Sequence, residues 1–338
     1  MKPHVHHSVF GVLMLVGIVL IGCTSSPESR ETLTIPPTME PDATPDIRMP
    51  GSITFRYPSL YPEGIEYDMK TDQFLISSAT EGTIFSVAYD GSLTPFIEDD
   101  QIGSTLGLEI DHINNRLLVA ASSFTEESGC LSANNDGATL STYDLETREL
   151  IFRVDLARLD PGRPHLANDV AVDSNGIAYV TDTYAALIYR VDTHGNASVL
   201  VEDPALDSIN GIVAHPDGFL LVGAYPNKLF RVSVEEPELD PVQLSPAVSF
   251  DISDGMLLVD EASLAMVAYP NSVILLLRSN DGWKTATLEG ESHGHAAGWA
   301  TTIALRDGDI YTLYSHLDHF QECLAPVDEF SIQRVIFK

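Results

Sequence analysis

The chain repeats one four-part unit, and this repeat constrains its fold more than any other feature. The clearest copy, residues 168–201, has four short runs of apolar or alternating residues separated by turn residues such as Ser174-Asn175-Gly176. Such runs are typical of short antiparallel strands. Copies open at residues 63, 107, 168, 210, 254 and 301, so successive openings lie 44, 61, 42, 44 and 47 residues apart. A period in the low forties with four strands per unit predicts an all-β, six-bladed β-propeller.

Two irregularities in the repeat predict how the ring is built. The longest interval contains a polar stretch rich in Gly and Asn, residues 125–137, which indicates an inserted loop in blade two. The last copy has three strand candidates instead of four, whereas residues 52–58 form a candidate with no partner in their own repeat. Pairing this segment into blade six would close the ring and remove an open sheet edge. The propeller is therefore expected over residues 51–338.

Residues 1–23 are predicted to be an export signal. Lys2 and several histidines precede an apolar run from Val9 to Ile21, which is short for a membrane span and typical of a signal peptide. The ending Leu20-Ile21-Gly22-Cys23 resembles the bacterial lipobox, and this resemblance implies cleavage before Cys23 and attachment of lipid to its sulfur. The alternative is an ordinary signal anchor that happens to contain a cysteine.

Residues 24–50 are rich in Ser, Thr, Pro and Glu and are expected to form a flexible tether. Because Thr24 follows the cysteine, nothing resembles the aspartate that retains lipoproteins at the inner membrane. We therefore expect an extracytoplasmic, lipid-anchored protein of a bacterial membrane, the outer one in a Gram-negative cell.

The charge of the chain limits its partners. The formal net charge is -31 at pH 7, from 49 acidic and 18 basic side chains. This argues against nucleic acid, which needs clustered cations, and against electrostatic adhesion to anionic lipid. The expected partner is a small molecule, any membrane contact is expected to run through the lipid alone, and the protein is expected to be a monomer.

The openings of the repeats carry the candidate site. Four copies open on a residue with a carboxylate or amide oxygen: Glu63, Asn168, Asn210 and Asp254. The pseudo-sixfold geometry brings these positions together at one mouth of the channel, with Asp169 beside them. Such oxygens suit a hard divalent cation, Ca²⁺ first and Mg²⁺ or Mn²⁺ next. The alternative for any one of them is a turn residue before glycine.

This pattern resembles the senescence-marker-protein and gluconolactonase family of six-bladed propellers. The likeness covers roughly residues 55–338, and its most specific elements are Pro62-Glu63-Gly64, Asn168-Asp169, Asn210-Gly211 and Asp254-Gly255. The resemblance implies that the four opening residues bind one divalent cation and that Asp254 acts as a base or orients water. It also implies hydrolysis of lactones or related esters, in which a cation polarises the carbonyl and a carboxylate takes a proton from water.

The sequence also departs from the family pattern. Ile65-Glu66-Tyr67 stands where family members often have a bulky group such as Trp, and Asn168 is followed by Asp instead of Gly. These departures bear on substrate identity more than on metal binding. No Gly-x-Ser-x-Gly motif indicates a covalent serine route.

Five histidines are expected in loops on the face of the channel mouth: His165, His293, His295, His316 and His319. A functional interpretation makes one of them a general base or a substrate clamp, with His293 and His295 as the best candidates. We expect His165, like Asp169, to support the metal ligands. The alternative for each is a solvated histidine without a role.

Cys130 and Cys323 remain after processing, and both are expected in loops between the second and third strands of their blades. Blades two and six both neighbour blade one, so a disulfide could bridge the mouth in an oxidising compartment. The alternative is two unrelated free thiols. Two functions stay open: a metal-dependent lactone or ester hydrolase, and a noncatalytic propeller that binds a small ligand, polysaccharide or protein around a structural metal.

Overall fold

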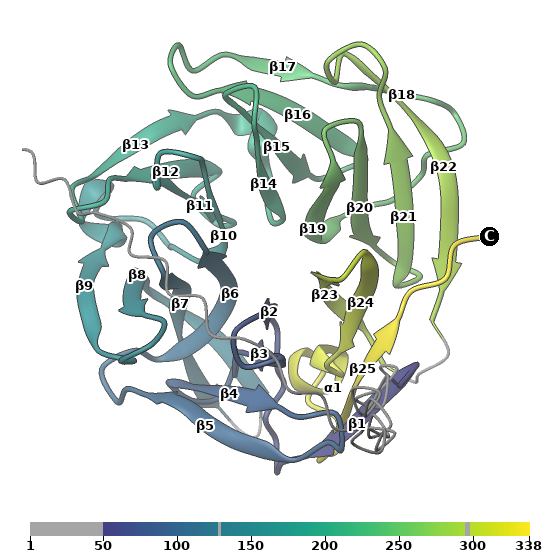
Figure 1. Ribbon diagram of the computed structural model, residues 1–338. Coiled ribbons are helices and arrows are strands. Elements are labelled where there is room, and N and C mark those ends of the chain that lie inside the picture. The colour runs from purple at the N-terminus through teal and green to yellow at the C-terminus, as the bar shows by residue number, and fades with distance from the viewer. Residues whose placement is uncertain (1–49, 128–129, 295–297) are drawn as a thin grey trace, which may run out of the picture. The chain divides into compact units, whose positions relative to one another are not determined.

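Six blades surround a central channel in the computed structural model, which describes residues 50–127, 130–294 and 298–338 (Figure 1). Each blade is a sheet of at least four strands whose first strand lines the channel and whose fourth lies toward the rim. The predicted six-bladed β-propeller is confirmed.

The first three blades follow the chain in simple order. Blade one contains β2 (Ile65–Asp68), β3 (Gln73–Ile76), β4 (Thr83–Val87) and β5 (Leu93–Glu98). Blade two contains β6 (Ser104–Asp111), β7 (Arg116–Glu127), β8 (Cys130–Asp144) and β9 (Leu150–Asp155). Blade three contains β10 (Ala167–Val172), β11 (Ala178–Asp182), β12 (Leu187–Val191) and β13 (Ala197–Glu202).

Among the last three blades, blade five has one additional strand, and blade six includes the first strand of the domain. Blade four contains β14 (Ile212–His215), β15 (Phe219–Ala224), β16 (Lys228–Ser233) and β17 (Leu239–Pro241). Blade five contains β19 (Ser253–Asp260), β20 (Ser263–Ala268), β21 (Val273–Arg278) and β22 (Thr285–His293), with the short parallel β18 (Gln243–Leu244) outside it. Blade six contains β23 (Ala300–Arg306), β24 (Asp309–Tyr314), β25 (Glu329–Arg334) and β1 (Ser52–Arg56).

Helices are few and short: η1 (Leu156–Leu159), η2 (Pro204–Leu206) and α1 (Leu317–Gln321). In the described part of the chain, no helix has the length and apolar character needed to cross a membrane.

The cores lie between neighbouring blades. Strand β11 is buried along its whole length, because a second strand of a blade is covered on both faces. The outer strand β13, in contrast, has only partly buried and exposed positions. Between blades six and one, Phe74 packs against Tyr311 with ring centroids 5.2 Å apart. Within blade six, Phe55 of β1 packs against Phe330 of β25 at 5.9 Å. Burial of such rings supplies most of the energy that holds adjacent blades together.

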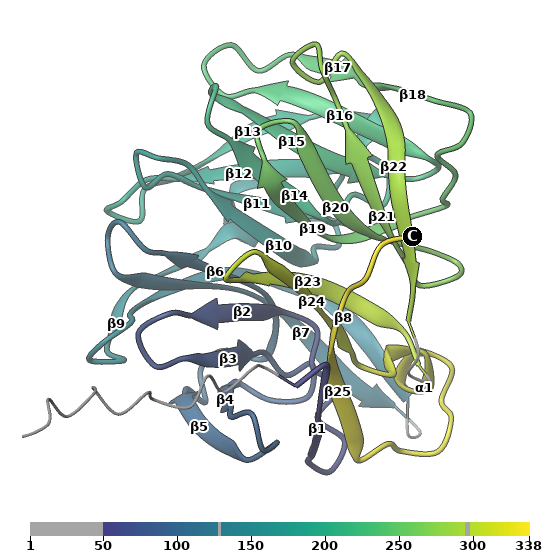
Figure 2. The ribbon, with the colours of Figure 1, turned by 45° about the vertical axis from the view of Figure 1, so that its right-hand side comes forward.

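The ring closes through its first strand, as the sequence predicts. Strand β1 pairs antiparallel with β25, in a register that includes Ile53 with Ile332 and Phe55 with Phe330. Figure 2 shows the two strands side by side at the edge of blade six. The closing blade therefore combines both ends of the folded domain.

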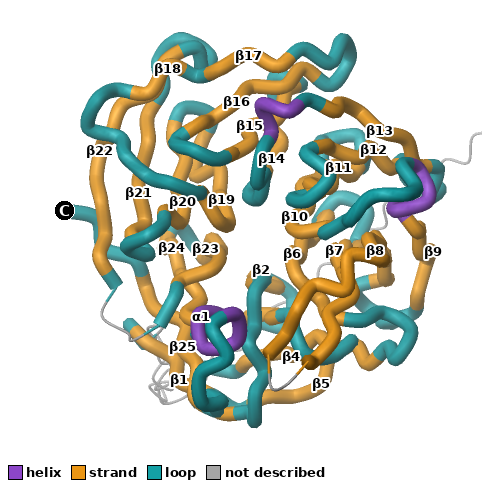
Figure 3. The backbone as a smooth tube through the Cα atoms, turned by 180° about the vertical axis from the view of Figure 1, so that it is seen from behind, coloured by secondary structure: helices purple, strands orange, loops and turns teal. Residues whose placement is uncertain are grey.

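The predicted inserted loop of blade two is wrong. Residues 124–127 and 130–133 continue the ladder between β7 and β8, beginning at Phe124 paired with Ala133. The stretch is polar and rich in Asn, which favours a loop, but a hairpin that projects beyond its blade needs no apolar face. Strand β8 contacts α1, and both lie toward the viewer beside the channel in Figure 3.

Candidate functional site

Four buried oxygens without a hydrogen-bond partner belong to the four residues that the repeat analysis selected. They are Oε2 of Glu63, Oδ1 of Asn168, Oδ1 of Asn210 and Oδ1 of Asp254. Each residue lies at or just before the start of the first strand of its blade, so the four come from blades one, three, four and five. Buried polar atoms almost always have a partner, so four such oxygens at equivalent positions of four blades indicate a binding site.

The residue after each ligand holds the strands of neighbouring blades close together. A Cβ on Gly64 would lie 2.4 Å from the carbonyl oxygen of Leu106, and one on Gly211 would lie 2.2 Å from that of Asp254. Only glycine permits such an approach. In blade three this residue is Asp169, whose Oδ2 accepts a hydrogen bond of 3.2 Å from the backbone N–H of Ile212 in the next blade. In blade three, where Asp169 replaces the glycine of the family pattern, this side-chain hydrogen bond connects the neighbouring strands.

Burial and mutual repulsion act on the carboxyl groups of the site. The pKa of Glu63 is raised well above its usual range by burial and by the charges of Asp254 and Asp169. Burial also raises the pKa of Asp254 to about 7, although hydrogen bonds from Tyr269 and Asn210 oppose the shift. These shifts mean that the folded chain by itself disfavours two carboxylates here, and a bound divalent cation would offset that cost.

Hydrogen bonds orient three of the four ligands. The Nδ2 group of Asn168 donates to Oγ1 of Thr183 at 3.0 Å, which fixes the amide and leaves its Oδ1 for a ligand. The hydroxyl of Tyr269 lies 2.9 Å from Oδ2 of Asp254 and 2.5 Å from the carbonyl oxygen of Ala300. The side chain of Asn210 also donates to Asp254.

Tyr269 was missed by the sequence analysis although a signal exists. The sequence Ala-Tyr-Pro-Asn occurs twice, at residues 224–227 and 268–271, in the turn after the second strand of blades four and five. Tyr225 is 42% exposed, whereas Tyr269 contacts Asp254. The two Ala-Tyr-Pro-Asn segments are identical in sequence, so only the blade in which each lies distinguishes Tyr269 from Tyr225.

The donor set fits a hard divalent cation. It offers two carboxylates and two amide oxygens and no sulfur or imidazole, the ligand types that Ca²⁺ accepts. Among the described residues there is no group of three or more His, Cys, Asp or Glu side chains arranged to bind a metal. The present set has only two acidic members and does not conflict with that finding, because its other two donors are asparagines.

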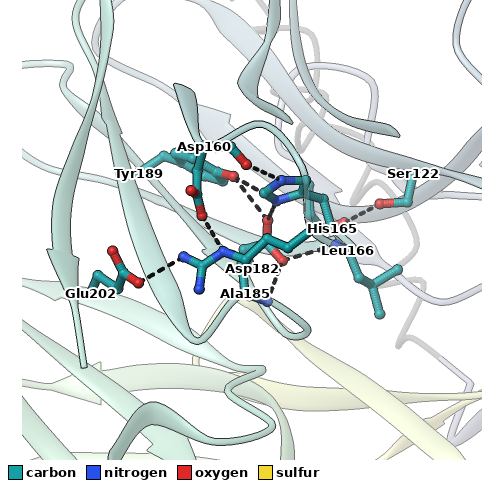
Figure 4. A network of polar contacts seen from close by, with 10 residues as sticks. Ser122, Asp160, His165, Leu166, Asp182, Ala185, Tyr189 and Glu202 are labelled. Carbon is teal, nitrogen blue, oxygen red and sulfur yellow. Dashed lines mark hydrogen bonds and ion pairs between the residues drawn. The ribbon is translucent and has the colours of Figure 1, made fainter. Parts of the chain in front are cut away.

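His165 lies inside blade three instead of at the rim. It is 3% exposed, and its Nδ1 lies 2.7 Å from Oδ2 of Asp182 while its Nε2 lies 2.8 Å from the carbonyl oxygen of Asp160 (Figure 4). The hydroxyl of Tyr189 donates to the same Asp182 oxygen at 2.9 Å. Both ring nitrogens therefore face acceptors and neither is left for a substrate.

The hydrogen bonds around His165 are nevertheless connected to the metal-ligand candidates through the backbone of β10 and β11. Oδ1 of Asp182 accepts the N–H of Leu166 at 2.9 Å, which holds the start of β10. Thr181 and Thr183, on either side of Asp182, contact Asp169 and Asn168 respectively. This arrangement is compatible with a supporting role for His165, which stays a prediction.

Of the four remaining candidate histidines, three are described, and none of these three has a contact with the four ligands among the described residues. The fourth, His295, lies outside the described residues. His293 ends β22, toward the rim of blade five, with an exposed side chain whose Nε2 is 3.8 Å from a carboxylate oxygen of Glu291. His316 starts α1 and is partly buried, and burial lowers its pKa. His319 is bonded through Nδ1 to the carbonyl oxygen of Ala325 at 2.8 Å.

The cysteines are described only in part. Cys323 is disulfide-bonded. The other two cysteines of the chain, Cys23 and Cys130, have side chains outside the described part, so the predicted pairing with Cys130 stays a prediction. The contact of α1 with β8 brings the two segments together, as that pairing requires.

A cavity of about 170 Å³ lies in the channel between the first strands of all six blades. Its lining includes Glu66, Glu109 and Asp169. Burial and the charge of Asp169 raise the pKa of Glu66 to about 8, and burial and the charges of Glu66 and Asp169 raise that of Glu109. The channel thus carries further acidic groups that favour protons when no cation is bound.

No family model matches the sequence, and comparison with curated proteins finds no match. Among solved structures, the chain is similar to the major allergen Mala s 1 of Malassezia sympodialis, with a TM-score of 0.68 and 18% identity over 85% of this chain and 96% of that one.

It is also similar to virginiamycin B lyase from Staphylococcus aureus, with a TM-score of 0.52 and 14% identity over 84% of this chain and 100% of that one. A third structure, reported as a "putative gluconolactonase", has a TM-score of 0.53 and 14% identity over 85% of this chain and 94% of that one. These comparisons show the fold. At such identities they assign no activity to this chain.

Proposed function

We propose that the protein is a metal-dependent hydrolase of lactones or related esters. One divalent cation, Ca²⁺ before Mg²⁺ or Mn²⁺, is held by Glu63, Asn168, Asn210 and Asp254. The observation that carries this proposal is that each of the four residues has a buried oxygen without a hydrogen-bond partner. The similarity in fold to a gluconolactonase-like structure supports it only as evidence that this scaffold suits such a site.

When bound, the cation supplies an electrophile that polarises the substrate carbonyl. Side chains of the protein accept the proton and orient the metal ligands. Asp254, held at Oδ2 by Tyr269, is the carboxylate that takes a proton from water as the water oxygen bonds to the carbonyl carbon. The bond from that carbon to the ring or ester oxygen then breaks, and the leaving oxygen takes the proton that Asp254 accepted. Thr183 keeps the amide of Asn168 in one orientation throughout.

The test is hydrolysis of a panel of lactones and aryl esters by the purified protein, with Ca²⁺ and with EDTA. We expect activity with Ca²⁺ that EDTA abolishes and that Glu63→Gln and Asp254→Asn each reduce by at least about 100-fold. The matched control is Asp260→Asn, at the opposite end of the same strand β19, where the side chain is exposed. Activity that persists in EDTA would contradict the proposal.

The noncatalytic alternative predicts a different pair of results. In that case Ca²⁺ raises the melting temperature, because a ligand bound only by the folded state stabilises it. Hydrolysis of every member of the panel would then stay at the rate without protein. Isothermal titration of the EDTA-treated protein with CaCl₂ measures the site itself and is independent of any substrate.

A further inference from the structure

Another buried oxygen without a partner belongs to Asp318, on helix α1. Its Oδ1 is buried, and no hydrogen bond or ion pair reaches it from the described residues. A buried carboxylate oxygen without a donor is unfavourable, so this oxygen calls for a donor beyond those that the described residues supply. The repeat gives no hint of this residue, because α1 follows β24 only in blade six.

Asp318 is continuous with the metal ligands through a short chain of contacts. The hydroxyl of Tyr269, which contacts Asp254, is within electrostatic reach of Asp254, Glu63 and Asp318. The ring of Trp299 packs against that of Tyr269, with centroids 5.0 Å apart. The neighbouring Gly298 lies against the ring of His316, where helix α1 begins. Gly298 and Trp299 therefore connect the start of α1 to Tyr269, and Tyr269 contacts Asp254.

Asp318 lacks a compensating positive group among the described residues. A divalent cation compensates the carboxylates of Glu63 and Asp254, whereas Asp318 has no oppositely charged partner in the described part of the chain. His316 is close to Asp318, but burial opposes its protonation. The rings of Trp299 and Tyr269 add aromatic surface, which attracts cations. The net charge of -31 adds a long-range attraction for the same class of ligand.

We infer that Asp318, with the rings of Trp299 and Tyr269, forms a subsite for a positively charged, ammonium-type group of the substrate. This inference rests on the proposed function and makes it more specific: the preferred substrates are lactones or esters that carry a cationic substituent. Asp318 is then a specificity-determining residue, because it binds a part of the substrate that does not react.

The first test compares a cationic lactone with its neutral analogue. We expect the protein with Ca²⁺ to prefer α-amino-γ-butyrolactone over γ-butyrolactone in kcat/KM. Asp318→Asn should lower the ratio of the two values by about 10-fold, mainly through the KM of the amino lactone. Asp328→Asn, an exposed carboxylate nearby in sequence, should keep the ratio. A ratio that Asp318→Asn does not change would overturn the subsite.

The second test does not depend on turnover. The chain has two tryptophans, of which Trp283 is 1% exposed and Trp299 only partly buried, so a ligand at the subsite should change the fluorescence of Trp299. Titration of the Ca²⁺-loaded protein with tetramethylammonium chloride, against NaCl at equal ionic strength, should give a saturable change. Asp318→Asn and Trp299→Phe should abolish it.

The two tests separate the two proposals. If neither lactone nor any other member of the lactone and ester panel is cleaved, the proposed hydrolase activity fails, and the tetramethylammonium titration alone decides on the subsite. If both lactones are cleaved equally well and tetramethylammonium acts no differently from sodium, the subsite is refuted while the hydrolase proposal stands.

Discussion

Tyr269 and Asp254 share one hydrogen in a way that couples the site to protonation. The tyrosine oxygen lies 2.9 Å from Oδ2 of Asp254 and 2.5 Å from the carbonyl oxygen of Ala300, but a hydroxyl has a single hydrogen to donate. When Tyr269 donates to Ala300, the contact with Asp254 is a hydrogen bond only if Asp254 carries a proton. When Asp254 is ionised, as a metal ligand must be, Tyr269 donates to it instead.

Tyr269→Phe should therefore weaken the site without removing a proposed ligand. Loss of a hydrogen bond to a charged oxygen costs about 1.5 kcal/mol, which corresponds to roughly 10-fold weaker binding of Ca²⁺. Calorimetric titration with CaCl₂ measures the change. The matched control is Tyr225→Phe, the equivalent residue of blade four, whose side chain is 42% exposed. Equal losses in both variants would show that the contact with Asp254 has no special role.

The raised pKa values predict how pH affects the cation-free protein. The pKa of Asp254 is about 7 in the folded state, and that of Glu63 is also raised, whereas an unfolded Asp has a pKa of about 3.9. The folded state thus binds more protons between these values, so its stability is greatest at the acidic end and falls as pH rises toward about 7.

Melting temperatures in EDTA across about pH 5 to pH 8 measure this effect, and Asp254→Asn should flatten the profile. Ca²⁺ displaces the protons, so its affinity should increase over the same range. A calcium affinity that falls with rising pH would contradict the assignment of these carboxylates.

Closure of the ring by β1 predicts a large effect from a small deletion. Removing residues 52–56 takes Ile53 and Phe55, both 1% exposed, out of the core of blade six and leaves β25 as an open edge. We expect loss of the cooperative thermal transition, since burial of two such side chains contributes about 3–6 kcal/mol. Differential scanning calorimetry checks this. A deletion that lowers the melting temperature by only a few degrees would argue against closure by this strand.

The partner of Cys323 can be identified by mass spectrometry. We predict a bridge to Cys130, which would tie α1 to the β7–β8 hairpin. Peptide mapping without reduction should give one linked peptide containing both residues, and Cys130→Ser should leave Cys323 free for alkylation. Alkylation of both thiols in the native, unreduced protein would be the contrary result.

Lipid attachment at Cys23 is a separate prediction, motivated by the sequence Leu20-Ile21-Gly22-Cys23. Expressed in a bacterium and fed labelled palmitate, the protein should become labelled and sediment with membranes. Cys23→Ala should abolish the label and leave unprocessed precursor, and labelling of that variant at the original level would be inconsistent with the lipobox.

The sequence predicted the repeat-encoded part of the site and missed the rest for a physical reason. The four opening residues occupy the same position in their repeats: Glu63, Asn168, Asn210 and Asp254. Because the blades are arranged around one axis, equivalent positions of their first strands lie close together at the channel. Tyr269 has an equally placed counterpart in Tyr225, so its role depends on contacts between blades that no repeat encodes. Helix α1 is an insertion, and its Asp318 could be located only in the folded chain. The β7–β8 extension was mistaken for a loop because its composition is polar.

The pairing of β1 with β25 also determines the order in which the chain can fold. Arg56 and Glu329 are bonded partners 273 residues apart in sequence. The first strand to emerge from the ribosome therefore has no sheet to join until nearly the whole chain has been made. Blades one to five can form in sequence, but blade six waits for both ends to meet, and contacts of such long range slow folding. The last blade, and with it the closed ring, is therefore expected to form only when synthesis is nearly complete.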